Sequence, residues 1–313
     1  MNLSQPVKLS RKRDLGDLIQ DSLAFIAQNW RPLFMAALTY LGPLYLIVGM
    51  FSGLFQARLG IDFNNPQALV DLFSDPVAMQ EFSQRVIGWE FAGMTGVAIF
   101  GYVMTVVVIN VFMILYKQLG STVPTPAQLQ ENTLRSYLPV FGRLIGLMFI
   151  VGLIYIVGAF IAGMGMAFLP VVGGFLFIGL VVLMVYLMVA LCFVLLITMN
   201  EDIGLMQAIS RSFSLIKGHW WQTFGLIIVF YLLLMIATWL VQIPVSTVSY
   251  LGEGSSLIEN KWYLIISGSI VSFLSGLLQV VYMVPINLQY FSLLKEDDTE
   301  GNSHLIDQIG TNT

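Results

Sequence analysis

Charged side chains are scarce in this sequence, making up 10% of its 313 residues, whereas 57% of the residues are hydrophobic. Soluble domains ordinarily carry about 25% charged residues, so a water-soluble fold of this composition would expose apolar patches and aggregate. The scarcity therefore argues against a soluble domain and predicts a membrane-integrated chain. The small net charge of −4 provides no basic footprint, so no nucleic-acid partner is expected.

Cysteine and histidine are almost missing as well. Cys192 is the single cysteine, which excludes an intrachain disulfide and a paired-cysteine metal motif. His219 and His304 are the only histidines and lie far apart in the sequence, so a histidine-based metal centre is not expected. The long apolar runs themselves contain no histidine that could activate a nucleophile. We therefore expect no enzymatic activity, no cofactor and no bound metal.

Long uncharged runs are abundant instead. Residues 32–57, 91–116 and 144–200 contain no charged side chain. Because about 20 apolar residues cross a hydrocarbon core, the first two runs each predict one span and the third predicts two. With two later runs, six spans are predicted, at residues 33–55, 91–116, 144–169, 175–199, 223–247 and 263–290.

Three amphipathic segments each precede a pair of these spans. They are predicted as surface helices at residues 14–30, 126–141 and 201–218. Asp14 and Asn200 are placed as N-caps, and Thr125 with Gln128 forms a capping-box pattern. Such helices are expected to lie along an anionic membrane surface, and the alternative is that they pack on their own protein.

The first and third surface segments share five identical residues at a spacing of 190. The identical pairs are Ile19 and Ile209, Ser22 and Ser212, Ile26 and Ile216, Trp30 and Trp220, and Phe34 and Phe224. The match suggests one unit used three times, a surface helix followed by two spans. The predicted fold is therefore an all-α polytopic membrane helix bundle, with one six-span domain over residues 1–294 and an acidic cytoplasmic tail over residues 295–313.

Residues 58–90 form the long hydrophilic loop of the sequence. Asn65-Pro66 and Asp75-Pro76 each resemble an N-cap followed by a proline in the first turn, which predicts short helices at 66–74 and 76–88. Eleven Lys and Arg residues fall on the side of the two termini, and three fall on the other side. This bias predicts cytoplasmic termini and an extracytoplasmic loop.

Three sets of residues are candidates for particular roles. Residues expected at the membrane interface are Arg11, Lys12, Arg13, Trp30, Arg31, Arg211, Lys217, Trp220 and Trp221. Small residues expected at close helix contacts are Gly158, Gly163, Gly268, Ser272 and Gly276. Prolines expected to kink their spans are Pro43, Pro244 and Pro285. None of these sets points to a particular chemical reaction.

The third surface segment resembles a segment of known membrane proteins. The run from Ala208 to Gly218, followed by Trp220-Trp221, is similar to one that recurs in uncharacterised bacterial multi-pass inner-membrane proteins. Among these is the membrane domain associated with glycerophosphodiester phosphodiesterases. The segments Arg13–Gly16 and Leu305–Gly310 look similar to the same group. This sequence contains no phosphodiesterase catalytic domain, so the resemblance implies a multi-pass bacterial inner (cytoplasmic) membrane protein without a transferable catalytic residue.

Two functions fit these expectations. The first is a non-catalytic scaffold or accessory subunit of a bacterial envelope complex, because helix-packing seams and surface helices occur without a catalytic constellation. The alternative is a transporter or lipid-handling protein for an uncharged or amphiphilic substrate. The cores of the predicted spans lack ionisable residues, which disfavours ion coupling. Expected partners are the lipid bilayer and either other membrane proteins or further copies of the chain.

Overall fold

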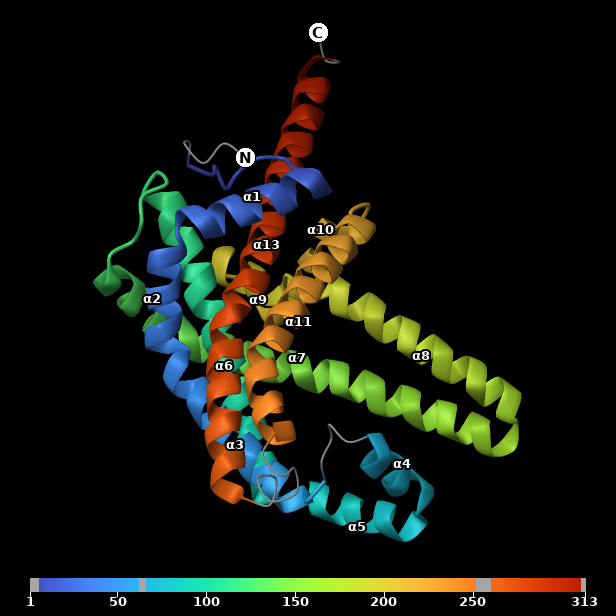
Figure 1. Cartoon of the computed structure of the whole chain (residues 1–313). Coiled ribbons are helices and arrows are strands. Elements are labelled where there is room, and N and C mark those ends of the chain that lie inside the picture. Colours follow the sequence, from blue (N-terminus) through green and yellow to red (C-terminus); the bar gives the residue numbers. More distant parts are fainter. Residues whose placement is uncertain (1–5, 62–65, 252–259, 311–313) are drawn as a thin grey trace. The chain divides into compact units, whose positions relative to one another are not determined.

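The computed structural model describes residues 6–61, 66–251 and 260–310, and every regular element within these ranges is an α-helix (Figure 1). Five helical stretches of the described chain are long and apolar enough to span a membrane, and a bent helix pair makes up to six. The stretches are α6 (Trp89–Gln118), α7 (Pro126–Phe168), α8 with α9 (Pro170–Asn200), α11 (Trp220–Leu251) and α13 (Lys261–Gly310). The predicted all-α class is confirmed, together with five or six stretches of membrane-spanning length among the described residues.

The chain divides into two compact units. Unit 1 comprises Met1–Trp30, Ile109–Phe230 and Met283–Thr313, and unit 2 comprises Arg31–Val108 and Tyr231–Tyr282. Helices α6, α11 and α13 therefore contribute residues to both units. Each unit has its own packing, and the two are considered in turn.

Unit 2 contains the bent pair α2 (Trp30–Tyr40) and α3 (Gly42–Leu59), whose axes differ by 53°. Pro43 lies in the first turn of α3 and has no N–H to donate to the preceding turn. The bend is thus at the position where the sequence predicts it. Pro244 and Pro285 lie inside α11 and α13, which continue through them, and the kinks expected there stay predictions.

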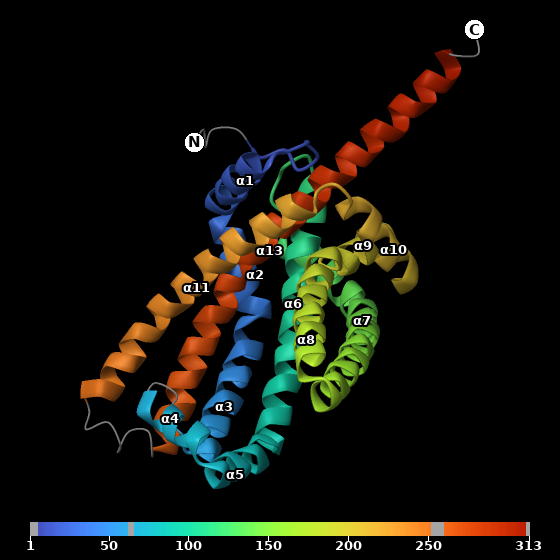
Figure 2. The same ribbon diagram turned by 90° about the vertical axis from the view of Figure 1, so that its right-hand side faces the viewer.

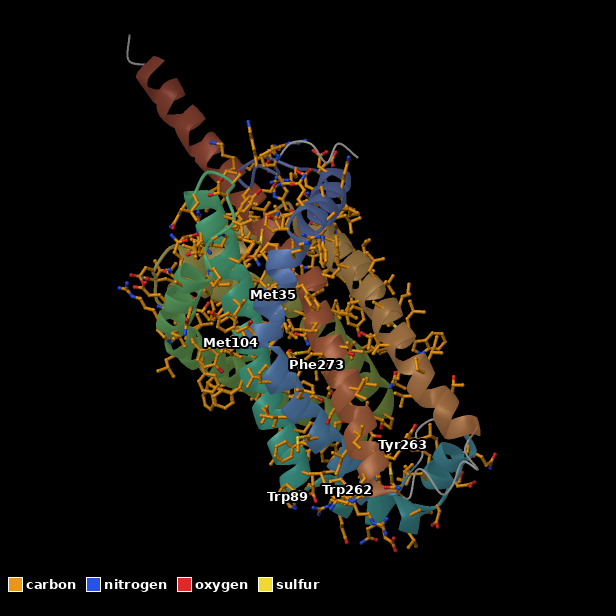
Figure 3. All side chains as sticks on the ribbon, turned by 60° about the vertical axis from the view of Figure 1, so that its left-hand side comes forward. Met35, Trp89, Met104, Trp262, Tyr263 and Phe273 are labelled. Carbon is orange, nitrogen blue, oxygen red and sulfur yellow. The ribbon has the colours of Figure 1, made fainter. Side chains whose placement is uncertain are left out.

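Two short helices of unit 2 follow α3. They are α4 (Pro66–Ser74) and α5 (Pro76–Val86), close to the predicted bounds. The predicted cap at Asp75 is confirmed, because its Oδ1 accepts a hydrogen bond from the Val77 N–H at 2.9 Å. Asn65 lies outside the described residues. Figure 3 shows Trp89, Trp262 and Tyr263 near one end of this unit, with Met104 of α6 and Phe273 of α13 further along those helices and Met35 on α2.

Unit 1 begins with α1 (Leu15–Gln28), and its predicted cap is confirmed by a 2.7 Å bond from the Asp17 N–H to Asp14 Oδ1. The buried face of α1 includes Phe25, whose ring meets Phe112 and Tyr116 of α6 edge-on, with centroids 6.4 and 5.1 Å apart. One face of α1 therefore packs on the protein itself.

Helix α7 differs from the prediction. The capping box at Thr125 is confirmed, but one helix of 43 residues runs from Pro126 to Phe168. The sequence instead predicted a surface helix ending at 141 and a separate span from 144. The helix continues through Arg143, whose Nη1 donates a hydrogen bond to the Thr198 carbonyl at 2.9 Å.

Helices α7 and α8 (Pro170–Ala190) lie side by side and form a hairpin that turns at Leu169 (Figure 2). The predicted span 175–199 is interrupted, since α8 ends at Ala190 and a separate α9 (Val194–Asn200) follows. Ser212, in α10 (Leu205–Ile216), donates to the Ala190 carbonyl at 2.6 Å. This buried bond satisfies a carbonyl that the end of α8 leaves without a helical partner.

Two expectations about helix ends are corrected in unit 1. Asn200 is the last residue of α9, and Gly204 is the N-cap of α10. Between them Asp202 has a φ of +47°, a left-handed conformation that stops one helix before the next begins. Helix α13 continues past residue 294 to Gly310, so the predicted tail begins as part of this helix.

Candidate functional site

Arg13 organises the N-terminal segment of unit 1. Its side chain is fully buried and its Nε lies 2.7 Å from Asp21 Oδ2. The guanidinium also donates to the carbonyls of Leu9 at 2.8 Å, Arg11 at 3.0 Å and Lys8. A buried arginine needs this set of acceptors because it carries five N–H donors. Arg13 is therefore an internal residue. The prediction that it presents its charge at a membrane interface is corrected.

The backbone of Arg13 joins this segment to two long helices. Its N–H donates to Ser292 Oγ of α13 at 2.9 Å, and its carbonyl accepts from Gln222 Nε2 of α11 at 2.9 Å. Together with the guanidinium contacts, these bonds fix residues 8–13 against α11 and α13. The contacts join positions more than 200 residues apart, which no local sequence pattern reveals.

Two carboxylates in the C-terminal half of α13 lie close to basic groups from three other segments. Glu296 pairs with Lys12 and lies 3.4 Å from His219 Nε2, and Asp297 lies 2.7 Å from Arg211 Nη2. Arg211 also lies 3.4 Å from Glu201. Burial lowers the pKa of Arg211, yet Asp297 and Glu201 together hold that pKa above its ordinary value, so the guanidinium stays charged.

The other predicted interface residues are mostly exposed. Exposed side chains are Arg11, Lys12, Trp30, Arg31, Lys217 and Trp221. Trp220 is half-buried, with its ring stacked between Tyr186 and Phe224 at centroid distances of 6.0 and 5.1 Å. Their placement at a membrane interface stays a prediction.

A buried amide cluster connects α6 to the end of α9. Asn110 is fully buried, its Nδ2 donates to the Met199 sulfur at 3.2 Å, and its Oδ1 accepts from Asn200 Nδ2 at 3.3 Å. Asn200 also donates to the Leu196 carbonyl at 2.7 Å. These bonds explain why Asn200 ends α9 and does not cap α10.

A pocket of about 390 Å³ adjoins this cluster. Its walls are Ile114, Lys117 and Gln118 from α6, Met199 and Asn200 from α9, and Phe291 from α13. The ammonium of Lys117 lies 5.0 Å from the centroid of the Phe291 ring, a cation–π contact. The pocket thus combines one cation and two amides with three apolar side chains.

Unit 2 has a polar cluster of its own. The Tyr45 hydroxyl donates to Gln279 Oε1 at 2.7 Å and lies 3.4 Å from Thr105 Oγ1. The Tyr45 ring fills the space beside Gly101 and Gly276, which places Gly276 at a helix contact as predicted. This cluster ties together α3, α6 and α13, and the sequence analysis did not single out Tyr45 or Gln279.

The small residues expected at helix contacts have different surroundings. A Cβ on Gly268 would lie 2.9 Å from the Gly49 carbonyl, and one on Gly158 would meet the Leu180 side chain. Both glycines therefore occupy close contacts. The prediction that Gly163 lies at a close helix contact is wrong, because a Cβ there would meet nothing within 4 Å. Ser272 is half-buried and its role stays a prediction.

Within the described ranges no group of three or more His, Cys, Asp and Glu side chains is placed to hold a metal ion. The arrangements that the structure does bring together are hydrogen-bond networks, ion pairs and the Lys117 pocket.

Comparison with known proteins places the chain in one family. No curated protein and no solved structure matches the chain. A family profile described as a domain of unknown function, DUF7847, matches residues 132–291, which is just over half of the 313 residues. The match runs from within α7 to Phe291 of α13 and includes the α7–α8 hairpin. The chain belongs to the family defined by the domain of unknown function DUF7847.

Proposed function

We propose that the protein is a non-catalytic integral membrane component, a scaffold or accessory subunit of a bacterial envelope complex. Its α7–α8 hairpin is the element that contacts a partner membrane protein. The observation that carries this proposal is the exposure of the hairpin. Only 6% of the most apolar 18-residue stretch of α7 is buried. Large side chains exposed on the hairpin include Phe149, Ile156, Phe160, Phe168, Val171 and Phe175.

Exposed apolar side chains alone are compatible with lipid, because lipid tails are as apolar as leucine. The glycines of the hairpin distinguish a protein-contact face. A Cβ would meet nothing within 4 Å at Gly142, Gly152, Gly163, Gly174 and Gly179. Open glycines let a second helix approach the backbone closely, which favours packing by a partner helix.

We place the protein in a bacterial inner membrane with both termini cytoplasmic. The asymmetry of basic residues and the resemblance to inner-membrane proteins support this placement. Tags at the two termini should be protected in intact spheroplasts and accessible after lysis. A tag at either terminus that is accessible from outside would contradict it.

The threefold repeat and the link to phosphodiesterase-associated membrane domains are proposals of the same kind. Ser22 and Ser212 are equivalent in the alignment, and both are fully buried on the first helix of their repeats. Trp30 begins α2 and Trp220 begins α11, at the start of the apolar stretch in each repeat. These equivalent positions support a repeated unit.

Site-specific photo-crosslinking in native membranes tests the scaffold proposal. A photoreactive residue at Phe160 or Phe175 should form one defined protein adduct, whose mass distinguishes a partner from a second copy of the chain. Trp239 of α11 is also exposed and apolar, and it is the matched control position, at which only lipid adducts are expected. Lipid adducts alone at all three positions would overturn the proposal.

A second candidate function is handling of an uncharged or amphiphilic substrate such as a lipid. The pocket beside Lys117 favours it, because that pocket has both polar and apolar walls. Purified protein in vesicles should then accelerate lipid transfer between leaflets. Vesicles with and without protein showing equal rates would exclude this function for the lipids used.

A further inference from the structure

We infer that the pocket lined by Lys117, Asn200 and Phe291 binds the phosphate-bearing headgroup of an anionic phospholipid. Its volume of about 390 Å³ falls near the lower end of the range for small-ligand pockets, roughly 300–1,000 Å³. It lies entirely within unit 1. This inference does not depend on a protein partner at the α7–α8 hairpin.

The charge of the pocket is the first argument. Four basic groups of unit 1 have carboxylate partners among the described residues, in the pairs Arg11 with Asp17, Lys12 with Glu296, Arg13 with Asp21, and Arg211 with Glu201 and Asp297. Lys117 has the Phe291 ring beside it, and no carboxylate of the described residues lies within 4.0 Å of its ammonium. None of the residues that line the pocket is acidic. A phosphate would supply the missing counter-charge.

The local dipoles make Lys117 the group on which binding depends. Helix α6 ends at Gln118, and the negative end of its dipole disfavours an anion there, although the carbonyls of Leu115, Tyr116 and Lys117 accept hydrogen bonds from the turn that follows. The ammonium of Lys117 lies in that same turn and offsets the repulsion. Arg143 adds a second cation near this wall, because it donates to the carbonyl of Thr198, the residue before Met199.

The remaining walls select an amphiphile over a free anion. Ile114, Met199 and Phe291 present apolar surface, suited to the glycerol and upper acyl region of a lipid. The side of the pocket formed by α9 is held in place, because Asn200 donates to Asn110 Oδ1 and to the Leu196 carbonyl. A preformed pocket of this kind loses little conformational entropy when the lipid binds.

Native mass spectrometry and thermal unfolding of the detergent-purified full chain test this inference. Phosphatidylglycerol should remain bound and raise the melting temperature more than phosphatidylcholine or inorganic phosphate does. Lys117→Gln should reduce phosphatidylglycerol affinity by about tenfold, since a hydrogen bond to a charged group is lost. Lys117→Arg should keep most of the affinity. Lys217→Gln, which removes an exposed cation beyond the end of α10, should leave it unchanged.

Three outcomes would overturn the inference. One is equal phosphatidylglycerol retention by the wild type and Lys117→Gln. Another is an equal loss in Lys117→Gln and Lys217→Gln, which would indicate general surface charge. The third is protection by inorganic phosphate as large as that by the lipid, which would indicate a free-anion site. If lipid-free Lys117→Gln melts at the same temperature as the lipid-free wild type, a loss of lipid affinity in this variant does not result from misfolding.

Discussion

Two glycine-containing helix pairs in this protein have opposite surroundings. In unit 2, α3 and α13 approach so closely that a Cβ on Gly49 or Gly53 would overlap the α13 backbone. In unit 1, the α7–α8 hairpin makes such a backbone contact near its turn, where Gly173 meets Met166. Further along the hairpin, Gly163 and Gly179 are open.

The comparison shows that glycine content alone does not locate a helix contact. Glycine permits close approach, but a neighbouring backbone must be present to use it. The α3–α13 pair has its neighbour within the chain. The open glycines of the hairpin mark surface where a neighbour from another chain would fit.

The largest expected effect follows from filling the α3–α13 contact. Gly49→Leu would place side-chain atoms in the backbone of Gly268 and Ser269, which cannot move aside as a side chain would. We expect a loss of at least about 3 kcal/mol in the free energy of unfolding, the upper end for overpacking. SDS-titrated unfolding followed by tryptophan fluorescence measures it. A loss below 1 kcal/mol would show that this pair separates easily.

A smaller effect is expected from the same kind of substitution at the turn of the hairpin. Gly173→Leu would overlap the backbone of Met166, but α7 is so little buried that the two helices can splay apart. We expect a loss of roughly 1–3 kcal/mol in the same unfolding assay. A loss equal to that of Gly49→Leu would remove the distinction between the two pairs.

Removing the hydroxyl of Tyr45 distinguishes the contribution of its hydrogen bond to the stability of unit 2 from the contribution of ring packing. Tyr45→Phe keeps the ring beside Gly276 and removes the 2.7 Å hydrogen bond to Gln279. A hydrogen bond between membrane helices contributes about 0.6 kcal/mol on average, so we expect a loss of roughly 0.5–1.5 kcal/mol. A second substitution, Gln279→Leu, should cost little more in the Tyr45→Phe background. Additive losses would mean that the two side chains act separately.

The smallest effect on stability is expected where the hairpin is open. Gly163→Leu meets no neighbour within the chain and should change the free energy of unfolding by less than about 0.5 kcal/mol. It should nevertheless reduce crosslinking from Phe160 to a partner, because the added side chain fills the approach surface. Unchanged crosslinking together with unchanged stability would assign this face to lipid.

Much of the fold follows from local features of the sequence. The helical class and the membrane-length stretches are predictable because the uncharged runs are long enough to cross a bilayer. A chain in the bilayer must satisfy its backbone hydrogen bonds internally, as an α-helix does. The caps at Asp14, Asp75 and Thr125 are predictable because each satisfies a backbone N–H only two or three residues away. The bend before Pro43 follows from the missing proline N–H.

What the sequence did not predict depends on contacts between distant residues. The sequence predicts that Arg143 belongs to a helix ending before the membrane, but the acceptor for its guanidinium lies 55 positions later, at Thr198. The side chain of Asn200 suits an N-cap, which is what the sequence predicts, yet Asn110 of another helix accepts its hydrogen bond. The Lys117 pocket brings together residues from α6, α9 and α13 in the same way.

The contacts of the Arg13 guanidinium suggest how this segment would vary among relatives. Three of its four acceptors are main-chain oxygens, which any amino acid supplies, and Asp21 is the exception. The residue types at positions 8, 9 and 11 can therefore vary among relatives. The arginine at position 13 and the acidic residue eight positions later should be retained together. Paired retention of these two positions across divergent N-termini would be the evolutionary trace of this contact.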